Sequence, residues 1–268
     1  MGKHLLFKGN CLDRIDEVGD NSIALTVTSP PYFNAKVYGG EEDNVGNNKD
    51  YEDYLNKIRL LLTKLYKKMV DGGIVCWNSS PVLDEGLRIG IPFDTNKIFI
   101  DLGFQLLEDV VWKKPSGAAK LRVGGWIQNQ GKPMTYHCNI TTEYIMVYKK
   151  PGIREVGEFD DFRGYYPNKI IPKDLITNVW EINPETSKHY HDAPFPYELA
   201  KRCILLWSFK GDTVLDPFLG SGTVMKVARD LKRNSIGMEL SDEYVKVAKD
   251  EMGFYQKALF DTEEYKEL

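Results

Sequence analysis

Ile23-Ala24-Leu25-Thr26-Val27 leads directly into Thr28-Ser29-Pro30-Pro31-Tyr32. The first five residues are mostly apolar or β-branched and too few for a helix, so they predict a buried strand. The two prolines fix two φ angles and remove two backbone donors, which leaves nearby carbonyls without ladder partners. The stretch therefore predicts a rigid loop at the carboxyl end of a strand, with a hydroxyl, bare carbonyls and an aromatic face. An ordinary proline-rich turn is the alternative.

Helical and strand patterns alternate on both sides of this loop. Residues 51–69 carry apolar side chains at helical intervals and stop at Asp71-Gly72-Gly73. Further helices are predicted at 95–102, 196–207, 221–231 and 242–256. Seven strands are predicted at 4–8, 23–27, 74–77, 104–112, 142–149, 213–216 and 234–239. This alternation predicts an α/β fold with a doubly wound parallel sheet.

The length of 268 residues suits a single large α/β domain, 1–268. No apolar run approaches the ~18 residues that span a bilayer, and the first residues lack a signal-peptide pattern, so we expect a cytoplasmic protein without membrane contact. The four cysteines form no C-x-x-C pair, which is typical of reduced thiols. We expect no metal, because His189 and His191 have no third ligand at a recognisable spacing.

Positive charge is concentrated in one segment of a chain whose net charge is −4. Residues 110–142 contain no Asp or Glu, and their basic side chains are Lys113, Lys114, Lys120, Arg122 and Lys132. Glycines and the amides Gln128, Asn129 and Gln130 accompany them, so we interpret 113–140 as a nucleic-acid-binding loop inserted in the domain. A solvated insertion is the alternative. Residues 150–178 show little periodicity and form a second insertion.

A second loop stands at another strand end. Asp216-Pro217-Phe218-Leu219-Gly220-Ser221-Gly222-Thr223 follows the strand Thr213-Val214-Leu215 and opens a helix. Its glycines permit close backbone approach, and the helix amino terminus presents free N–H groups. The pattern is neither G-x-G-x-x-G nor a P-loop, and an Asp at the strand end would repel phosphate but suit an ammonium group.

Glu239 ends the next strand, where an acidic side chain can accept hydrogen bonds from ribose hydroxyls. N–H donors for a carboxylate, Asp216 for an amine and Glu239 for a ribose together describe an amino-acid-bearing nucleoside. We therefore expect S-adenosylmethionine as the cofactor.

The two loops, in this order, resemble the catalytic and cofactor motifs of the DNA amino-methyltransferases, in the subgroup where the catalytic motif comes first. The similarity extends over most of the chain. It includes Asn178-Val179-Trp180, His191-Asp192-Ala193-Pro194-Phe195-Pro196, 104–115 and 143–149. Gly9-Asn10-Cys11 resembles a motif of this family, usually G-D-C, that contacts the adenine of the cofactor.

The resemblance implies a seven-stranded, Rossmann-like, circularly permuted fold with helices on both faces, in which strand 4–8 follows the helix after Glu239 in the wound order. It implies a catalytic role for Ser29, Pro30, Pro31 and Tyr32. It implies cofactor contacts for Asn10, Cys11, Asp216, Pro217, Phe218, Gly220, Ser221, Gly222, Thr223 and Glu239. The resemblance also implies that residues 150–178 form a small target-recognition region.

The expected reaction is methylation of an exocyclic amine on a flipped-out base. Ser29 Oγ and the Pro30 carbonyl would accept hydrogen bonds from the two N–H groups of the base amine and favour a pyramidal amine nitrogen. Tyr32 would stack on the base. In the resembled family a serine at the first loop position goes most often with cytosine N4 and an aspartate with adenine N6, so we expect a cytosine-N4-specific, site-specific enzyme.

Three alternatives remain open: an adenine-N6 DNA methyltransferase, an RNA cytosine-N4 methyltransferase and a non-catalytic nucleic-acid-binding module. The expected partner is double-stranded DNA, with RNA as the alternative. A cognate restriction endonuclease is a candidate partner, and the chain would act as a monomer or homodimer.

Overall fold

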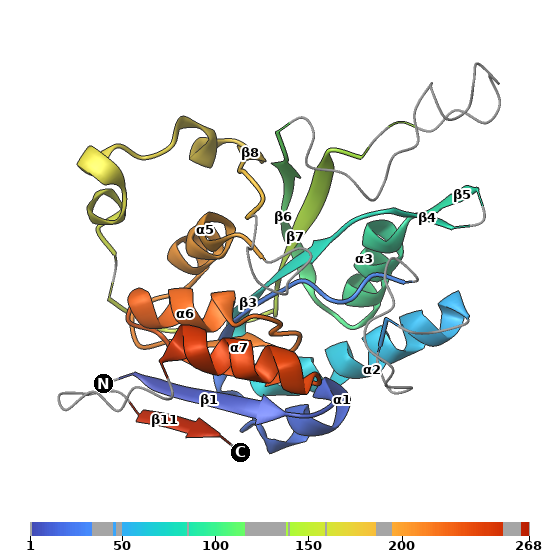
Figure 1. Ribbon diagram of the computed structural model, residues 1–268, viewed down its shortest axis with the longest axis horizontal. Helices are drawn as coiled ribbons and strands as arrows, with labels where there is room; N and C mark the ends of the chain where they lie inside the picture. The colour runs from blue at the N-terminus through green and yellow to red at the C-terminus, as the bar shows by residue number, and fades with distance from the viewer. Residues whose placement is uncertain are drawn as a thin grey trace.

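The computed structural model describes residues 2–33, 45–46, 50–84, 86–115, 138, 140–158, 160–185, 195–253 and 264–267. At its centre is a nine-stranded sheet in the order β11-β1-β10-β9-β2-β3-β7-β6-β8 (Figure 1). Its strands are β1 (Lys3–Lys8), β2 (Ile23–Thr28), β3 (Met69–Ser79), β6 (Gln105–Lys113), β7 (Thr142–Lys149), β8 (Val179–Glu181), β9 (Thr213–Asp216), β10 (Asn234–Glu239) and β11 (Glu264–Glu267). A separate antiparallel pair consists of β4 (Val82–Asp84) and β5 (Leu87–Ile89).

Helices cover both faces of the sheet. They are α1 (Cys11–Arg14), α2 (Tyr51–Lys68), α3 (Ile91–Asp101), α5 (Tyr197–Trp207), α6 (Thr223–Asp230) and α7 (Asp242–Met252). Because successive strand residues point to opposite faces, β3 serves two cores. Val75 and Trp77 pack in the cluster that contains α2 and α3, whereas Ile74 and Cys76 pack in the cluster that contains α5 and α6. The doubly wound α/β architecture is confirmed.

The sheet is not parallel throughout. β1, β10, β9, β2 and β3 pair in parallel, but β7 lies antiparallel between β3 and β6. The expectation of an all-parallel sheet was therefore wrong at this end. β6 and β7 are consecutive in the chain, and antiparallel neighbours do not require the crossover connection that parallel neighbours require.

All seven expected strands are present, and the two additional strands lie at the edges of the sheet. β8 has three residues and β11 has four, which is too short to give a clear alternation pattern in the sequence. β1 pairs in parallel with β10, with His4 opposite Ser235. The first strand therefore occupies the place after α7 in the wound order, as a circularly permuted fold requires.

The glycines Gly72 and Gly73 do not end helix α2. The helix ends at Lys68, and Met69 already has extended dihedrals of φ −77° and ψ 142° as the first residue of β3. Gly72 lies within the strand at φ +72° and its N–H donates to the Lys150 carbonyl. The glycine pair marks an irregularity in β3, which is a usual position for glycine inside a strand.

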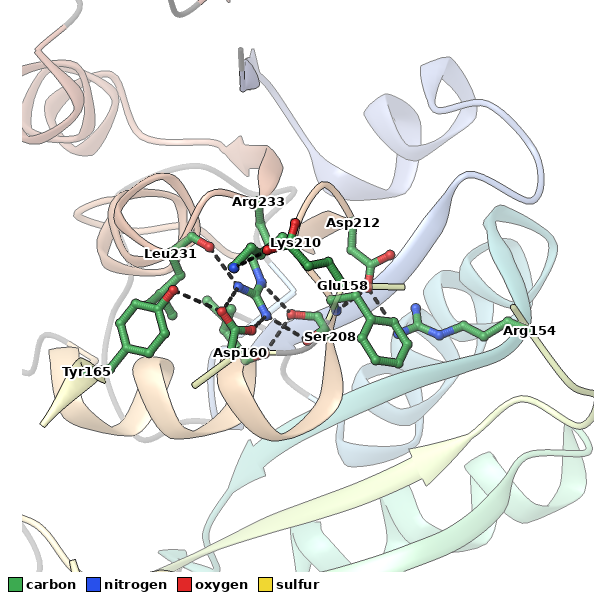
Figure 2. A network of polar contacts seen from close by, with 11 residues as sticks. Arg154, Glu158, Asp160, Tyr165, Ser208, Lys210, Asp212, Leu231 and Arg233 are labelled. Carbon is green, nitrogen blue, oxygen red and sulfur yellow. Dashed lines mark hydrogen bonds and ion pairs between the residues drawn. The ribbon is translucent and has the colours of Figure 1, made fainter. Parts of the chain in front are cut away.

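Residues 160–181 are attached to the α5 side of the sheet by two buried arginines, the first of which is Arg233. Its side chain is fully buried and donates to both carboxylate oxygens of Asp160, at 3.2 and 2.5 Å (Figure 2). It also donates to the Ser208 carbonyl at 2.7 Å, and Tyr165 donates its hydroxyl to Asp160 at 2.9 Å. The beginning of this segment is thereby fixed to the end of α5 and the start of β10.

The second attachment is Arg202 on α5, which binds Asp174 with two hydrogen bonds of 2.9 and 3.2 Å. Asp174 Oδ2 also accepts the backbone N–H of Glu181, where β8 pairs in parallel with β6. From Asp160 onward, through Asp174, the segment forms the short turns η3 (Phe162–Tyr165), η4 (Pro167–Lys169) and η5 (Lys173–Ile176). None of the described helices is long and apolar enough to cross a membrane.

Candidate active site

One edge of the sheet collects the polar residues. Parallel strands end at the same edge, so the residues that follow β1, β10, β9, β2 and β3 are neighbours there. β7 runs the opposite way and therefore begins at that edge, with Tyr144 opposite Ser79. β6 is antiparallel to β7, which places Lys113 opposite Thr142 at the same edge.

Asp216 links the two predicted loops. It is 4% exposed, and its Oδ1 accepts hydrogen bonds from Thr28 Oγ1 at 2.6 Å and from the Phe218 N–H at 3.0 Å. Burial raises the pKa of the Asp216 carboxyl to about 7, although both hydrogen bonds act in the opposite direction. No described residue binds Oδ2, so this oxygen is available to a ligand's ammonium group.

The turn after Asp216 requires glycine. Gly222 has φ +91°, and a Cβ there would lie 3.1 Å from the Cα of Ala248 on α7. As the residue before α6, Gly222 also provides no side-chain cap, so the first-turn N–H groups of α6 receive no side-chain acceptor at this position. These donors, at the positive end of the helix dipole, suit a carboxylate.

Glu239 lies beside this turn and is partly exposed. Its Oε2 accepts the Gly220 N–H and its Oε1 accepts the Ser241 N–H, each at 2.8 Å. A carboxylate has about four acceptor positions, so oxygens held in this way can still accept ribose hydroxyls. The ribose contact of Glu239 stays a prediction.

Asn10 and Cys11 lie next to Glu239 because the Gly9 N–H donates to the Glu239 carbonyl at 2.9 Å. Asn10 Oδ1 caps α1 by accepting the Leu12 N–H at 3.0 Å. Cys11 is 5% exposed, and burial raises the pKa of its thiol to about 12, so the thiol is neutral. Their contact with a cofactor adenine stays a prediction.

These residues fit S-adenosylmethionine. Asp216 Oδ2 can accept its ammonium group, the amino terminus of α6 can receive its carboxylate, and Glu239 can accept its ribose hydroxyls. Pro217, Phe218, Ser221 and Thr223 complete the loop between these groups. The cofactor supplies a sulfonium whose methyl group is electrophilic.

The catalytic loop contains a hydrogen-bonded cluster. Ser29 Oγ lies 3.3 Å from the Tyr32 hydroxyl, and Tyr32 donates to Glu143 Oε2 at 2.9 Å. Asn78 Nδ2 lies 3.1 Å from Ser29 Oγ, 3.1 Å from the Tyr32 hydroxyl and 2.7 Å from Glu143 Oε2. Ser29 and Pro31 are partly exposed, whereas Pro30 and Tyr32 are buried. The structure thus brings Ser29 and Tyr32 together, and the catalytic roles of Ser29, Pro30, Pro31 and Tyr32 stay predictions.

Asn78 and Glu143 were not among the predicted site residues. Asn78 follows the apolar residues 74–77 within β3, and Glu143 is the first acidic residue after the acid-free segment 110–142. Each position is therefore only weakly marked in the sequence. Neither signal indicates that the two meet, because this depends on the antiparallel direction of β7.

The basic residues divide into two groups. Lys114 belongs to the hydrogen-bonded cluster around Ser29. Its Nζ lies 2.5 Å from Glu143 Oε1 and 4.4 Å from the centre of the Trp112 ring. Lys113 pairs at 3.2 Å with the exposed Glu181. Lys120, Arg122 and Lys132 lie outside the described residues, as does most of the 113–140 insertion. Nucleic-acid contact by all five stays a prediction.

No group of three or more His, Cys, Asp or Glu that could hold a metal occurs among the residues that the structure describes. His189 and His191 lie outside them, together with Asp192, Ala193 and Pro194 of the motif before the cofactor loop.

The fold is an α/β fold in which the Thr28–Asp216 hydrogen bond joins a proline-rich loop to a glycine-containing loop at one edge of the sheet. Comparison with known proteins gives the family. A family model described as DNA methylase matches residues 23–250, so the chain belongs to this family. It is therefore a DNA methyltransferase that uses S-adenosylmethionine.

Relatives of this chain agree with that assignment. The Type II methyltransferase M.MjaI of Methanocaldococcus jannaschii is 29% identical over 92% of this chain and 90% of its own length. Among solved structures, the candidate DNA modification methylase TTHA0409 of Thermus thermophilus is 26% identical, with a TM-score of 0.72 over 98% of this chain and 99% of its own. TTHA0409 has also been crystallised with S-adenosyl-L-methionine. The cytosine-N4-specific PvuII DNA methyltransferase shares the fold, with a TM-score of 0.70 and 21% identity over 96% of this chain and 86% of its own.

Proposed function

We propose that the protein methylates the exocyclic N4 amine of cytosine at a specific site in double-stranded DNA. The observation that carries the proposal is the position of the Ser29 hydroxyl. Thr28, the residue before it, is hydrogen-bonded to Asp216 of the cofactor loop at 2.6 Å. An amine held by Ser29 is therefore adjacent to the methyl donor held by Asp216.

The loop increases the reactivity of a weak nucleophile. The lone pair of an exocyclic base amine is delocalised into the ring, and acceptors aimed at both N–H bonds favour a pyramidal nitrogen. Ser29 Oγ and the Pro30 carbonyl are the proposed acceptors. Alignment of the nitrogen with the sulfonium methyl lowers the barrier further, because the two reactants are held in a near-attack geometry.

The choice of cytosine rests on Ser29. A serine supplies one neutral hydroxyl acceptor, and in the resembled family this residue most often accompanies cytosine N4. The fold of the PvuII enzyme, which is cytosine-N4-specific, supports the same choice at the level of architecture only. Adenine N6 is the second candidate, because a hydroxyl can also accept from the adenine amine, which carries two N–H bonds of the same type.

The two insertions are the proposed DNA-contacting parts of the single domain. Residues 150–178 form the target-recognition region, and Lys169 and Lys173 are exposed in it. Asn168 and Lys169 have φ of 54° and 57°, a conformation that non-glycine residues seldom adopt outside functional or tightly constrained turns. Lys120, Arg122 and Lys132 of the basic loop would contact phosphates while the target base is flipped out.

The Type II designation of M.MjaI supports a place in a restriction–modification system, with a cognate restriction endonuclease as partner. In the same proposal the enzyme acts as a monomer or as a homodimer. Sedimentation of the purified protein with and without duplex DNA measures its oligomeric state directly.

Methyl transfer with labelled S-adenosylmethionine tests the proposal. The protein is incubated separately with duplex DNA and with total RNA, and the nucleosides are analysed by mass spectrometry. We expect label on N4-methyldeoxycytidine from DNA. Label only on N6-methyldeoxyadenosine would replace the cytosine assignment with the adenine one, and label confined to RNA would replace the substrate. Cofactor binding without any transfer would indicate a binding module.

A further inference from the structure

The cluster around Ser29 leads from the reacting amine to a buried carboxylate. We propose that Glu143 is the terminal proton acceptor of the reaction and that Ser29 and Tyr32 carry the proton to it. This inference rests on the proposed function, since it assumes an amine bound at Ser29. Glu143 does not touch the substrate, so it is a positioning residue that acts through the other two.

The direction of each hydrogen bond supports this path. An ionised carboxylate only accepts hydrogen bonds, so the 2.9 Å contact must have Tyr32 as donor and Glu143 Oε2 as acceptor. The Tyr32 oxygen can then accept the Ser29 hydroxyl, 3.3 Å away. The lone pairs of Ser29 Oγ are consequently available to the N–H of the substrate. The substrate N–H, the Ser29 hydroxyl and the Tyr32 hydroxyl therefore all donate in the direction of Glu143.

Asn78 holds the path in this direction. Its amide nitrogen has two protons and faces three acceptors, so it binds two of them at a time. The reverse orientation of the amide would place an oxygen 2.7 Å from Glu143 Oε2, where two acceptors repel, so the nitrogen faces the carboxylate. Asn78 therefore supplies donors only and leaves Glu143 as the proton acceptor of the cluster.

The side chains that bond to Glu143 suit a carboxylate, which only accepts hydrogen bonds. Glu143 is 5% exposed, and the described groups that bond to it include Lys114 from the end of β6, Asn78 from β3 and Tyr32 from the loop after β2. All three are donors, and Lys114 carries a positive charge 2.5 Å from Oε1. A negative charge in this setting also favours the positive charge that develops on the attacking nitrogen.

The proposed step conserves atoms and charge. The amine lone pair forms the new N–C bond, the C–S bond breaks, and its electron pair stays on sulfur as a thioether. The nitrogen then loses one proton to Ser29 Oγ, the Ser29 proton moves to the Tyr32 oxygen, and the Tyr32 proton moves to Glu143 Oε2. Glu143 ends as a neutral carboxylic acid and returns its proton to water after product release.

The test measures single-turnover methyl transfer to duplex DNA between about pH 5 and 9 with the full chain and saturating cofactor. Glu143→Gln keeps the shape of the side chain and removes the acceptor. We expect its rate of methyl transfer to fall about tenfold or more across this pH range, while KM for S-adenosylmethionine, measured in steady-state turnover, changes less than about twofold. Glu251→Gln, at the surface pair with Lys226, is the matched control and should behave as the wild type.

Tyr32→Phe interrupts the path in the middle and keeps the proposal testable if Glu143→Gln does not fold. The double variant should be no slower than the slower single variant, because residues of one path are not additive. The proposal is overturned if Glu143→Gln, or Tyr32→Phe in its place, transfers methyl groups at the wild-type rate, or if the two losses multiply in the double variant. A wild-type protein that transfers no methyl to DNA would instead refute the proposed function.

Discussion

Thr28 donates a 2.6 Å hydrogen bond to Asp216, and this bond joins the carboxyl ends of β2 and β9. Both residues are buried, and they are 188 positions apart in the chain. Thr28 precedes the loop that we propose receives the amine, and Asp216 begins the loop that we propose receives the cofactor. Together with the parallel pairing of β2 and β9, this contact fixes the relative position of the two loops.

Thr28→Val removes the hydroxyl and keeps the shape of the side chain. We expect the free energy of unfolding to fall by about 1–3 kcal/mol, because Asp216 loses a buried donor. The pKa of the Asp216 carboxyl should also rise above about 7. Denaturant unfolding measures the first effect. Thr63→Val, which removes a hydroxyl bonded to the Arg59 carbonyl on the exposed side of α2, is the control and should change stability by less than about 0.5 kcal/mol.

The raised pKa of Asp216 predicts how the cofactor-free protein responds to pH. Burial raises this pKa from 3.8 to about 7, so the folded state holds the proton more tightly than the unfolded state does. The resulting stability is fully present below the unfolded pKa and is lost as pH rises through about 7. Asp216→Asn should lack this loss and be more stable than the wild type at about pH 8. Parallel stability curves for the two proteins would contradict this expectation.

Cofactor binding should show the opposite dependence on pH. The ionised form of Asp216 attracts an ammonium group, so the affinity for S-adenosylmethionine should increase as pH rises through about 7. Asp216→Asn should bind about tenfold or more weakly and lose this increase, since one hydrogen bond to a charged group contributes about 1.5–3 kcal/mol. Isothermal titration calorimetry at several pH values measures both, and equal affinities would exclude an ammonium contact at this carboxylate.

Because the Arg233–Asp160 pair is buried, we expect a conservative substitution of its acid to cause a large loss of stability. Asp160→Asn leaves the buried Arg233 without its counter-ion, which should cost about 3–5 kcal/mol. Glu158→Gln, two residues away, affects a surface pair with Lys210 and should cost at most about 1 kcal/mol. Thermal or denaturant unfolding compares the two. Equal losses would mean that the buried pair does not hold the 150–178 region in place.

The basic loop predicts a salt-dependent effect on DNA binding. Replacing Lys120, Arg122 and Lys132 with glutamine should weaken binding to every duplex and lower the slope of log K against log salt by about 0.9 for each phosphate that the variant no longer neutralises. S-adenosylmethionine binding should not change. The matched control replaces Lys57, Lys67 and Lys97 on α2 and α3. If both triple variants bind DNA as the wild type does, the loop has no part in binding.

Most of the fold could be predicted from local patterns. The seven strands and the two loops at strand ends agree with the structure. The place of strand 4–8 beside the strand ending at Glu239 also agrees, but it followed from the family resemblance rather than from a local pattern. The direction of β7 and the short edge strands β8 and β11 do not follow from the sequence. An apolar strand pattern has the same period in either direction, and three or four residues give no period at all.

The two loops are specified by the local sequence, because proline and glycine act on the backbone within a few residues of their own position. Ser29 and Glu239 could therefore be assigned to strand ends, and Gly222 to the start of a helix, before any contact was known. The groups that surround Ser29, in contrast, depend on the tertiary arrangement. Glu143 is 111 residues from Tyr32 and Asn78 is 65 residues from Glu143, and they meet because β7 runs antiparallel beside β3. Strand order and direction are properties of the whole sheet, so no local pattern contains them.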